Sequence, residues 1–276
     1  MIEYRYRKHI RCLQYAAPAL CALLILAAWA GAFLCSRSAP RLLPPLRNAA
    51  ALATAFFGAE GLFLWYLMRR FALVRVRLED AGIAYESSQG AKFLPFADIV
   101  DVECSTARYL VGWVKIRTAD DSIRLTIVLE RIGDFIRRLK AALDAGSRRD
   151  LYDPRNLFRF YKTAEFADQS WERLYENLPA LSLAWALSLA AGYAALLPLH
   201  PLLRIFAAFS ALAAAQACYV AAEFWIARRV AGQADEAAFT CPLRDRGLEK
   251  RVYLGTAALF AALFLAAAGF VLPRLH

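Results

Sequence analysis

The chain has 276 residues, of which 60% are hydrophobic and 21% are charged, and its formal net charge is +10 at pH 7. Soluble domains are usually about 45–50% apolar and about 25% charged, so this composition indicates a membrane protein and excludes a disordered chain. Six cysteines in a chain of this length also exclude a small disulfide-stabilised scaffold.

Five apolar segments are each close to the ~20 residues that a helix needs to cross the ~30 Å hydrocarbon core of a bilayer. They lie at Cys12–Cys35, Ala49–Met68, Pro179–Leu199, Ile205–Ala227 and Val252–Leu272. The first has 24 residues, which is longer than the apolar core of a signal peptide, so we interpret it as an uncleaved span. The sequence therefore predicts a membrane α-helical bundle with five transmembrane helices.

The distribution of Lys and Arg predicts the orientation of these spans, because basic residues are retained on the cytoplasmic side. Of the 34 Lys and Arg residues, 29 lie in three segments: the one before the first span, the one between the second and third spans, and the loop between the fourth and fifth spans. We therefore expect a multi-pass protein of the bacterial inner (cytoplasmic) membrane. The N-terminus and residues 71–178 are expected in the cytoplasm, and the C-terminus in the periplasm.

The same map predicts four parts along the chain. Residues 1–70 hold an N-terminal cytoplasmic tail and the first two spans, and residues 71–146 form a cytoplasmic domain. Residues 147–178 form an amphipathic linker helix, and residues 179–276 hold the last three spans.

The pattern within residues 71–146 predicts an inserted α+β domain. Val74–Leu78 and Ile123–Ile127 alternate strictly between apolar and polar residues, which is typical of strands with one buried face. Apolar residues at helical spacing from Ile132 to Leu143 then predict a terminal helix, with Gly146 at its end. We expect five to seven antiparallel strands in a β-sandwich or barrel capped by this C-terminal helix.

Two runs in this domain carry a resemblance to a known family. Leu78–Tyr85 holds a glycine, an apolar residue and an aromatic residue of one strand, and Phe93–Val102 holds a Pro-aromatic-x-Asp-Ile-x-x-Val entry to another. With two further strands and the helix around Phe135 and Leu139, these runs resemble bacterial pleckstrin-homology-like (PH-like) domains, over about 75 residues. The resemblance implies a curved antiparallel sheet closed by a helix, frequent attachment to transmembrane helices, and no catalytic residues. The alternative is another small β-rich domain.

The linker helix is predicted to begin with Asp153 as its cap and Pro154 in its first turn. Two interpretations remain open for it. It is either an interfacial helix lying at the membrane surface, favoured because aromatic residues gather towards Pro179, or a helix packed on the strand domain.

Five basic residues are expected on the solvent faces of the strands: Arg75, Arg77, Lys115, Arg117 and Arg124. Eukaryotic domains of the resembling fold bind phosphoinositides in a basic pocket. Residues 69–178 hold 17 Asp and Glu against 19 Lys and Arg, however, so the domain is nearly neutral. We interpret these residues as a solvated face, with contacts to a partner or to anionic lipid headgroups as the functional alternative.

Polar residues inside the spans form a second candidate site. Glu60 lies near the middle of the second span, and Gln216 and Ser188 lie at similar depth in two others. An ionisable group at this depth is costly and requires a partner, so we expect a protonated Glu60 that is hydrogen-bonded to Gln216 or Ser188. The alternative makes Glu60 a proton or cation site. Glu223 is expected to reach Arg228 or interfacial water.

Motifs for nucleotide phosphates, zinc hydrolases or a nucleophilic serine are not found in the sequence, and no cofactor, metal site or nucleic-acid partner is expected. The leading hypothesis is a non-enzymatic inner-membrane protein whose PH-like domain binds a protein partner or organises a membrane complex, with the bilayer and a homo-oligomer as further partners. The alternative is a small ion-coupled transporter or transport subunit that uses Glu60. An intramembrane enzyme is the least favoured class.

Overall fold

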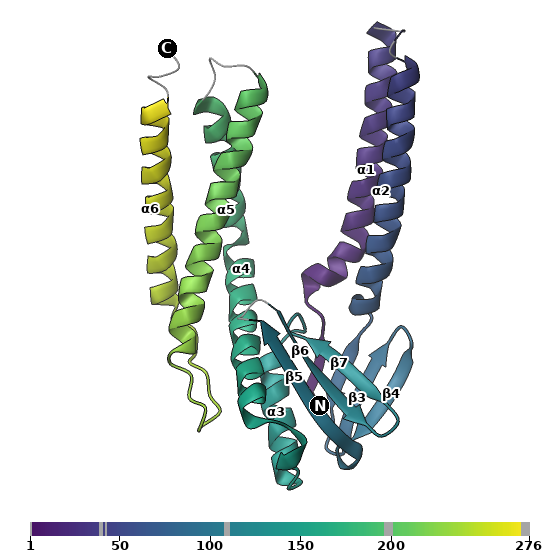
Figure 1. Cartoon of the computed structure of the whole chain (residues 1–276), viewed down its shortest axis with the longest axis vertical. Helices are drawn as coiled ribbons and strands as arrows, with labels where there is room; N and C mark the ends of the chain where they lie inside the picture. The colour runs from purple at the N-terminus through teal and green to yellow at the C-terminus, as the bar shows by residue number, and fades with distance from the viewer. Residues whose placement is uncertain (1, 39–40, 42, 108–110, 196–200, 272–276) are drawn as a thin grey trace. The chain divides into compact units, whose positions relative to one another are not determined.

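A computed structural model describes residues 2–38, 41, 43–107, 111–195 and 201–271. Five of its helices are long and apolar enough to cross a membrane, which supports the prediction of a membrane protein. The chain divides into two compact units (Figure 1). The first comprises residues 1–105 and 113–153, and the second comprises residues 106–112 and 154–276. The five helices are therefore split into a pair and a set of three.

The first unit contains a helical hairpin made of α1 (Lys8–Ser38) and α2 (Leu43–Ala72) (Figure 1). The two helices approach closely at Gly61, where an added Cβ would lie 3.2 Å from the Cβ of Cys21. Trp29 on α1 donates its indole N–H to Thr54 on α2 at 2.9 Å. Small residues and a shared hydrogen bond are typical of helix pairs in lipid, where the hydrophobic effect between helices is weak.

Six strands follow α2 and confirm the alternation in the sequence. They are β2 (Arg75–Leu78), β3 (Gly82–Ser87), β4 (Gly90–Pro95), β5 (Ile99–Ala107), β6 (Val111–Thr118) and β7 (Ser122–Thr126). A short 3₁₀ turn, η2 (Phe96–Asp98), joins β4 to β5. Gly82 is required where β3 begins, because a Cβ there would lie 2.4 Å from the carbonyl oxygen of Leu94 on β4.

A further strand, β1 (Ile2–Arg5), lies in the N-terminal segment that was predicted to be a cytoplasmic tail. It pairs antiparallel with β2, from Ile2 opposite Leu78 to Arg5 opposite Arg75. The first sheet therefore has the order β1-β2-β3-β4, and the second has the order β5-β6-β7. The helical hairpin is therefore inserted between the first two strands of the strand domain. Because these strands are neighbours in the sheet, the start of α1 and the end of α2 both lie next to the strand domain.

The helix α3 (Ile132–Ala145) completes the core of the strand domain. Phe135, Ile136 and Leu139 on α3 are fully buried, as are Ile83 and Leu125 on the two sheets. The predicted apolar stripe of this helix is therefore confirmed. The helix ends at Ala145, just before the predicted Gly146. The left-handed backbone conformation that often follows a helix is adopted by Ser147, with a φ of 57°, and not by the glycine. A short 3₁₀ turn, η3 (Arg149–Leu151), leads to the second unit.

The second unit contains α4 (Pro154–Ala195), α5 (Pro201–Ala231) and α6 (Arg246–Val271). The helix α4 begins at the predicted Pro154 and continues through Pro179 without a break, so residues 154–178 extend the third span. This continuity differs from the interfacial interpretation, which requires a separate helix before the third candidate span. Leu157, Phe160 and Ala164 are each at most 1% exposed, which also differs from a helix with one face in lipid headgroups.

Candidate functional site

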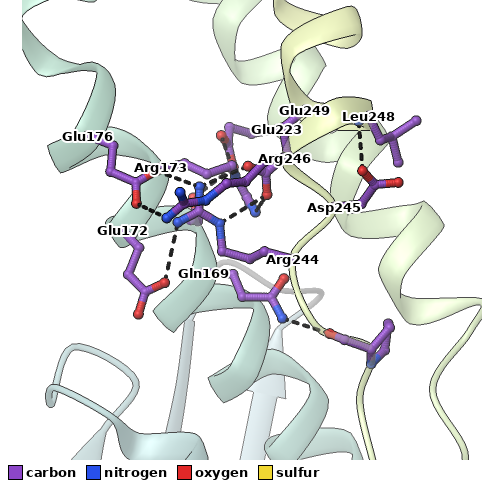
Figure 2. A network of polar contacts seen from close by, with 12 residues as sticks. Gln169, Glu172, Arg173, Glu176, Glu223, Arg244, Asp245, Arg246, Leu248 and Glu249 are labelled. Atoms are coloured by element: carbon purple, nitrogen blue, oxygen red, sulfur yellow. Dashed lines mark hydrogen bonds and ion pairs between the residues drawn. The ribbon is translucent and has the colours of Figure 1, made fainter.

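The polar centre of the second unit is Arg173 on α4, whose side chain is fully buried (Figure 2). Its Nε donates to Oε1 of Glu223 on α5 at 3.2 Å, and its Nη2 donates to Oε2 of the same carboxylate at 2.8 Å. Its Nη1 donates to Oε1 of Glu249 on α6 at 3.1 Å. One guanidinium therefore joins all three helices of this unit.

Glu223 accepts further hydrogen bonds on both carboxylate oxygens. The hydroxyl of Ser170 donates to Oε2 at 2.8 Å, and the phenol of Tyr253 on α6 donates to Oε1. A buried charge is costly unless it is paired and its remaining hydrogen-bonding capacity is satisfied. Four donor groups surround this carboxylate, so the geometry favours its ionised form.

A second arginine, Arg244, lies in the loop between α5 and α6 and extends the network (Figure 2). Its Nε and Nη2 donate to the two oxygens of Glu249 at 3.2 and 2.8 Å, and its Nη2 also donates to Glu176 at 2.9 Å. The hydrogen bond to Glu249 raises the pKa of Arg244 further above its usual value, with a smaller contribution from Glu176, against the opposing effect of burial. We define the Arg173 cluster as Ser170, Arg173, Glu176, Glu223, Arg244, Glu249 and Tyr253.

The loop that holds Arg244 is fixed against α4. Phe239, which has a left-handed φ of 50°, stacks on Tyr161 with ring centroids 4.6 Å apart. Gln169 donates its side-chain amide to the carbonyl oxygen of Pro242 at 3.0 Å (Figure 2). Asp245 then caps α6 by accepting the backbone N–H of Leu248 at 3.0 Å. These contacts position Arg244 next to Glu249, one turn into α6.

A cavity of about 530 Å³ lies beside the Arg173 cluster, between α4, α5 and α6. Its polar end is lined by Glu176, Arg244, Arg246, Glu249 and Lys250. The rest of its wall is mainly apolar and lies within the spans, with Leu181 and Trp185 from α4, Ala215 from α5, and Ala257 and Phe260 from α6. The cavity is therefore charged at one end and apolar along its length.

The structure places the predicted intramembrane residues in different units. Ser188 lies in the wall of the cavity and donates its hydroxyl to the carbonyl oxygen of Ala184 at 2.8 Å. Gln216 is half-buried on α5 of the same unit. Glu60 is an exposed residue of α2 in the other unit, so its pairing with Gln216 or Ser188 stays a prediction.

The five predicted basic residues are divided between the two sheets of the strand domain. On the first sheet, Arg77 pairs with Glu86 at 3.0 Å, and Arg75 lies 3.8 Å from Glu3. On the second sheet, Arg117 pairs with Asp101 at 2.7 Å. Arg124 lies opposite Lys115 in the register of β6 and β7, and its guanidinium is 4.4 Å from the ring centroid of Trp113. Neighbouring carboxylates and an aromatic ring contact most of these cations, which suits the solvated-face interpretation.

Arg173, Arg244 and Glu249 were not among the site residues predicted from the sequence, and Glu223 was predicted to reach Arg228 or interfacial water. The structure corrects this assignment, because Glu223 contacts Arg173 on the neighbouring helix instead. One signal was present: Glu223 is a carboxylate in an apolar segment, and such a group requires a partner. The partner lies 50 residues away in sequence, so periodicity along one helix does not reveal it.

Within the described residues, no group of three or more His, Cys, Asp and Glu side chains is arranged to hold a metal ion. Comparison of the chain with family models, with curated proteins and with solved structures gave no match.

Proposed function

We propose that this chain is a non-enzymatic bacterial inner-membrane protein whose PH-like strand domain docks a protein partner at the cytoplasmic surface. The observation that carries the proposal is the pairing of β1 with β2 across the inserted hairpin. Only Tyr6 and Arg7 separate β1 from α1, and only Leu73 and Val74 separate α2 from β2. Two such short links hold the strand domain at the membrane in a restricted orientation, which suits a module that presents one fixed surface.

The strand order supports the PH-like assignment. The resemblance implies a curved antiparallel sheet that is closed by a helix. The strand domain has four strands in one sheet, three in the other and a helix after the last strand, which agrees with that fold. The glycine of the resembling strand, Gly82, also has a structural reason, because β4 lies too close to allow a side chain there.

The orientation follows from charge. The N-terminus and the strand domain lie on the same side of the hairpin because β1 and β2 are neighbours. Basic residues are concentrated on that side, at 29 of 34 across the chain, so we place it in the cytoplasm.

The free edge of β4 is the docking surface that the geometry favours. Among the described strands, β4 is hydrogen-bonded only to β3, so its outer backbone groups are open to another strand. Phe93 on this strand is 50% exposed, so an aromatic ring lies next to the open edge. An extended protein segment can add to such an edge by backbone hydrogen bonds and cover the aromatic ring.

Photo-crosslinking in the native host tests this proposal. A photoreactive amino acid at Phe93 is expected to capture a discrete protein partner in intact cells. The same amino acid at Ala141, an exposed position on α3, is the matched control and is expected to give no such adduct. Co-purification of the captured protein with the unmodified chain in mild detergent would identify a stable complex.

Two results would overturn the docking function. Equal capture at Phe93 and Ala141 would show that the β4 edge has no special role. A chain that purifies without a partner and is stabilised by a small ion or solute would favour the carrier alternative, in which Glu60 takes part in transport.

A further inference from the structure

We propose that the cavity of the second unit binds one anionic phospholipid, with an acyl chain between the helices and the phosphate at Arg246 and Lys250. The wall of the cavity changes along its length from charged to apolar. A molecule that fills it must therefore be an amphiphile. This inference is independent of the docking function of the strand domain.

The length of the cavity matches one leaflet of a bilayer. Its lining residues on α4 extend from Glu176 to Ser188, which is about 18 Å along a helix at 1.5 Å per residue. The hydrocarbon region of one leaflet is half of the ~30 Å core, or about 15 Å. The charged end coincides with the start of the apolar segment at Pro179, which is where a headgroup would lie.

The arrangement of the helices leaves this space open for a chain. The helix α5 packs against both α4 and α6. At the cavity it contributes Ala215 and Cys218, two small side chains, together with Tyr219. Large apolar side chains, Trp185 on α4 and Phe260 on α6, form the flanking walls. Methylene groups between these walls would mainly contact apolar atoms.

The charges at the polar end favour an anion. Three cations, Arg244, Arg246 and Lys250, line this end together with two carboxylates, Glu176 and Glu249. Arg244 is held by both carboxylates and also lies 3.4 Å from Glu172, whereas the ion pair of Arg246 in the described part of the chain is with Glu176, and the Arg246 side chain is 78% exposed. Lys250 is exposed, and none of the ion pairs found in the described part of the chain includes it. A negative phosphate between Arg246 and Lys250 would meet the two exposed cations of this end.

A phosphatidylglycerol has this chemistry, since it carries one negative phosphate and two acyl chains. A phosphatidylcholine would satisfy the apolar wall, but its own trimethylammonium group would be repelled by Arg246 and Lys250. Free glycerol 3-phosphate would meet the cations without filling the apolar wall. Comparing phosphatidylglycerol with glycerol 3-phosphate therefore separates lipid binding from headgroup binding. Comparing it with phosphatidylcholine separates specific binding from general solvation by lipid.

Native mass spectrometry of the purified full-length chain, titrated with each of the three molecules in detergent, tests the proposal. We expect one tightly bound phosphatidylglycerol and weaker binding of phosphatidylcholine and of glycerol 3-phosphate. Lys250→Gln should weaken phosphatidylglycerol binding by about fivefold, the effect of one basic residue near an anionic lipid surface. Arg251→Gln removes the same charge one residue further on, outside the cavity lining, and should leave binding unchanged.

A second pair of variants tests the apolar part of the cavity. Ala257→Trp places a large side chain in the cavity, so it should abolish retention of the lipid. Ala258→Trp adds the same side chain at the next residue, which is exposed and does not line the cavity, and should retain the lipid. Any of three results would overturn the proposal. The two lipids would bind equally, glycerol 3-phosphate would bind as tightly as phosphatidylglycerol, or the two tryptophan variants would behave identically.

Discussion

Arg173 and Glu223 form a two-point ion pair between α4 and α5, with Nε 3.2 Å from Oε1 and Nη2 2.8 Å from Oε2. A planar guanidinium and a planar carboxylate meet in this way only at one relative position, so the pair specifies how the two helices are placed along each other. Glu249 adds the third helix through the same guanidinium. The Arg173 cluster thus contributes Glu176, Arg244 and Glu249 to the charged end of the cavity and also joins the three helices that form its walls.

Arg173→Met is expected to destabilise the second unit by about 3–5 kcal/mol, because it leaves Glu223 and Glu249 buried without their shared cation. Thermal unfolding of the purified chain in mild detergent measures this change. Arg246→Met removes an exposed ion pair with Glu176 and is the matched control, with an expected loss of about 0–1 kcal/mol. Equal effects of the two substitutions would contradict a structural role for the Arg173 cluster.

Gly192→Ala is expected to weaken the packing of α4 on α5 by about 1–3 kcal/mol. A Cβ at this position would lie 2.6 Å from the carbonyl oxygen of Ala207 and 2.8 Å from the Cβ of Ala211, so the two helices must separate. Gly255 on α6 has open space around it, and Gly255→Ala should leave stability unchanged or slightly increased. A detergent stability assay on both variants distinguishes a close helix contact from a general effect of glycine substitution.

Tyr4→Ala is expected to release β1 from the strand domain at a cost of about 3–5 kcal/mol, a value typical of large aromatic side chains in a core. The Tyr4 ring is 1% exposed and packs edge-on against Phe135 with centroids 5.3 Å apart, and its hydroxyl donates to Asp134 at 2.9 Å. Hydrogen exchange of the β2 amides should rise, because β1 covers them. Tyr4→Phe should lose only the hydrogen bond, about 1.5–3 kcal/mol. Unchanged exchange in Tyr4→Ala would show that β1 does not belong to the folded domain.

The strand domain is expected to lose stability in acid through Asp134. Burial alone would raise the pKa of this carboxyl, but hydrogen bonds from Arg137, Tyr4 and Arg138 outweigh it and hold the pKa below its usual value. A lowered pKa in the folded state contributes stability above the ordinary carboxyl pKa of about 3.9, and this contribution is lost as the pH falls through the folded value. Melting curves between pH 2 and pH 6 should show this loss, and Asp134→Asn should reduce it. An unchanged acid profile in Asp134→Asn would assign the effect to other groups.

The proposed orientation has its own test. A reporter that is active only in the cytoplasm should be active when fused to a chain that ends after Gly146, and inactive when fused after His276. This result is expected because the basic residues lie mainly on the side of the strand domain. The opposite pattern would invert the membrane topology.

Much of the strand domain was predictable because its signals are local. Alternation at Val74–Leu78 and Ile123–Ile127 indicates strands, and the apolar stripe from Ile132 to Leu143 indicates the helix that caps them. The strand β1 was not predictable, since Ile2–Arg5 is short and its partner β2 begins about 70 residues later, beyond the hairpin. Its pairing depends on two membrane helices returning the chain to the same place.

The sequence by itself determined the five apolar segments, the concentration of basic residues on one side and the period of the strands, since each depends on composition or on neighbours along the chain. Only the tertiary structure decided that β1 completes the first sheet, that α4 continues through Pro179, and that Arg173 joins Glu223 and Glu249. These features depend on which helices and strands lie next to each other. A buried charge selects its partner by proximity in space, and spacing along the sequence does not contain that information.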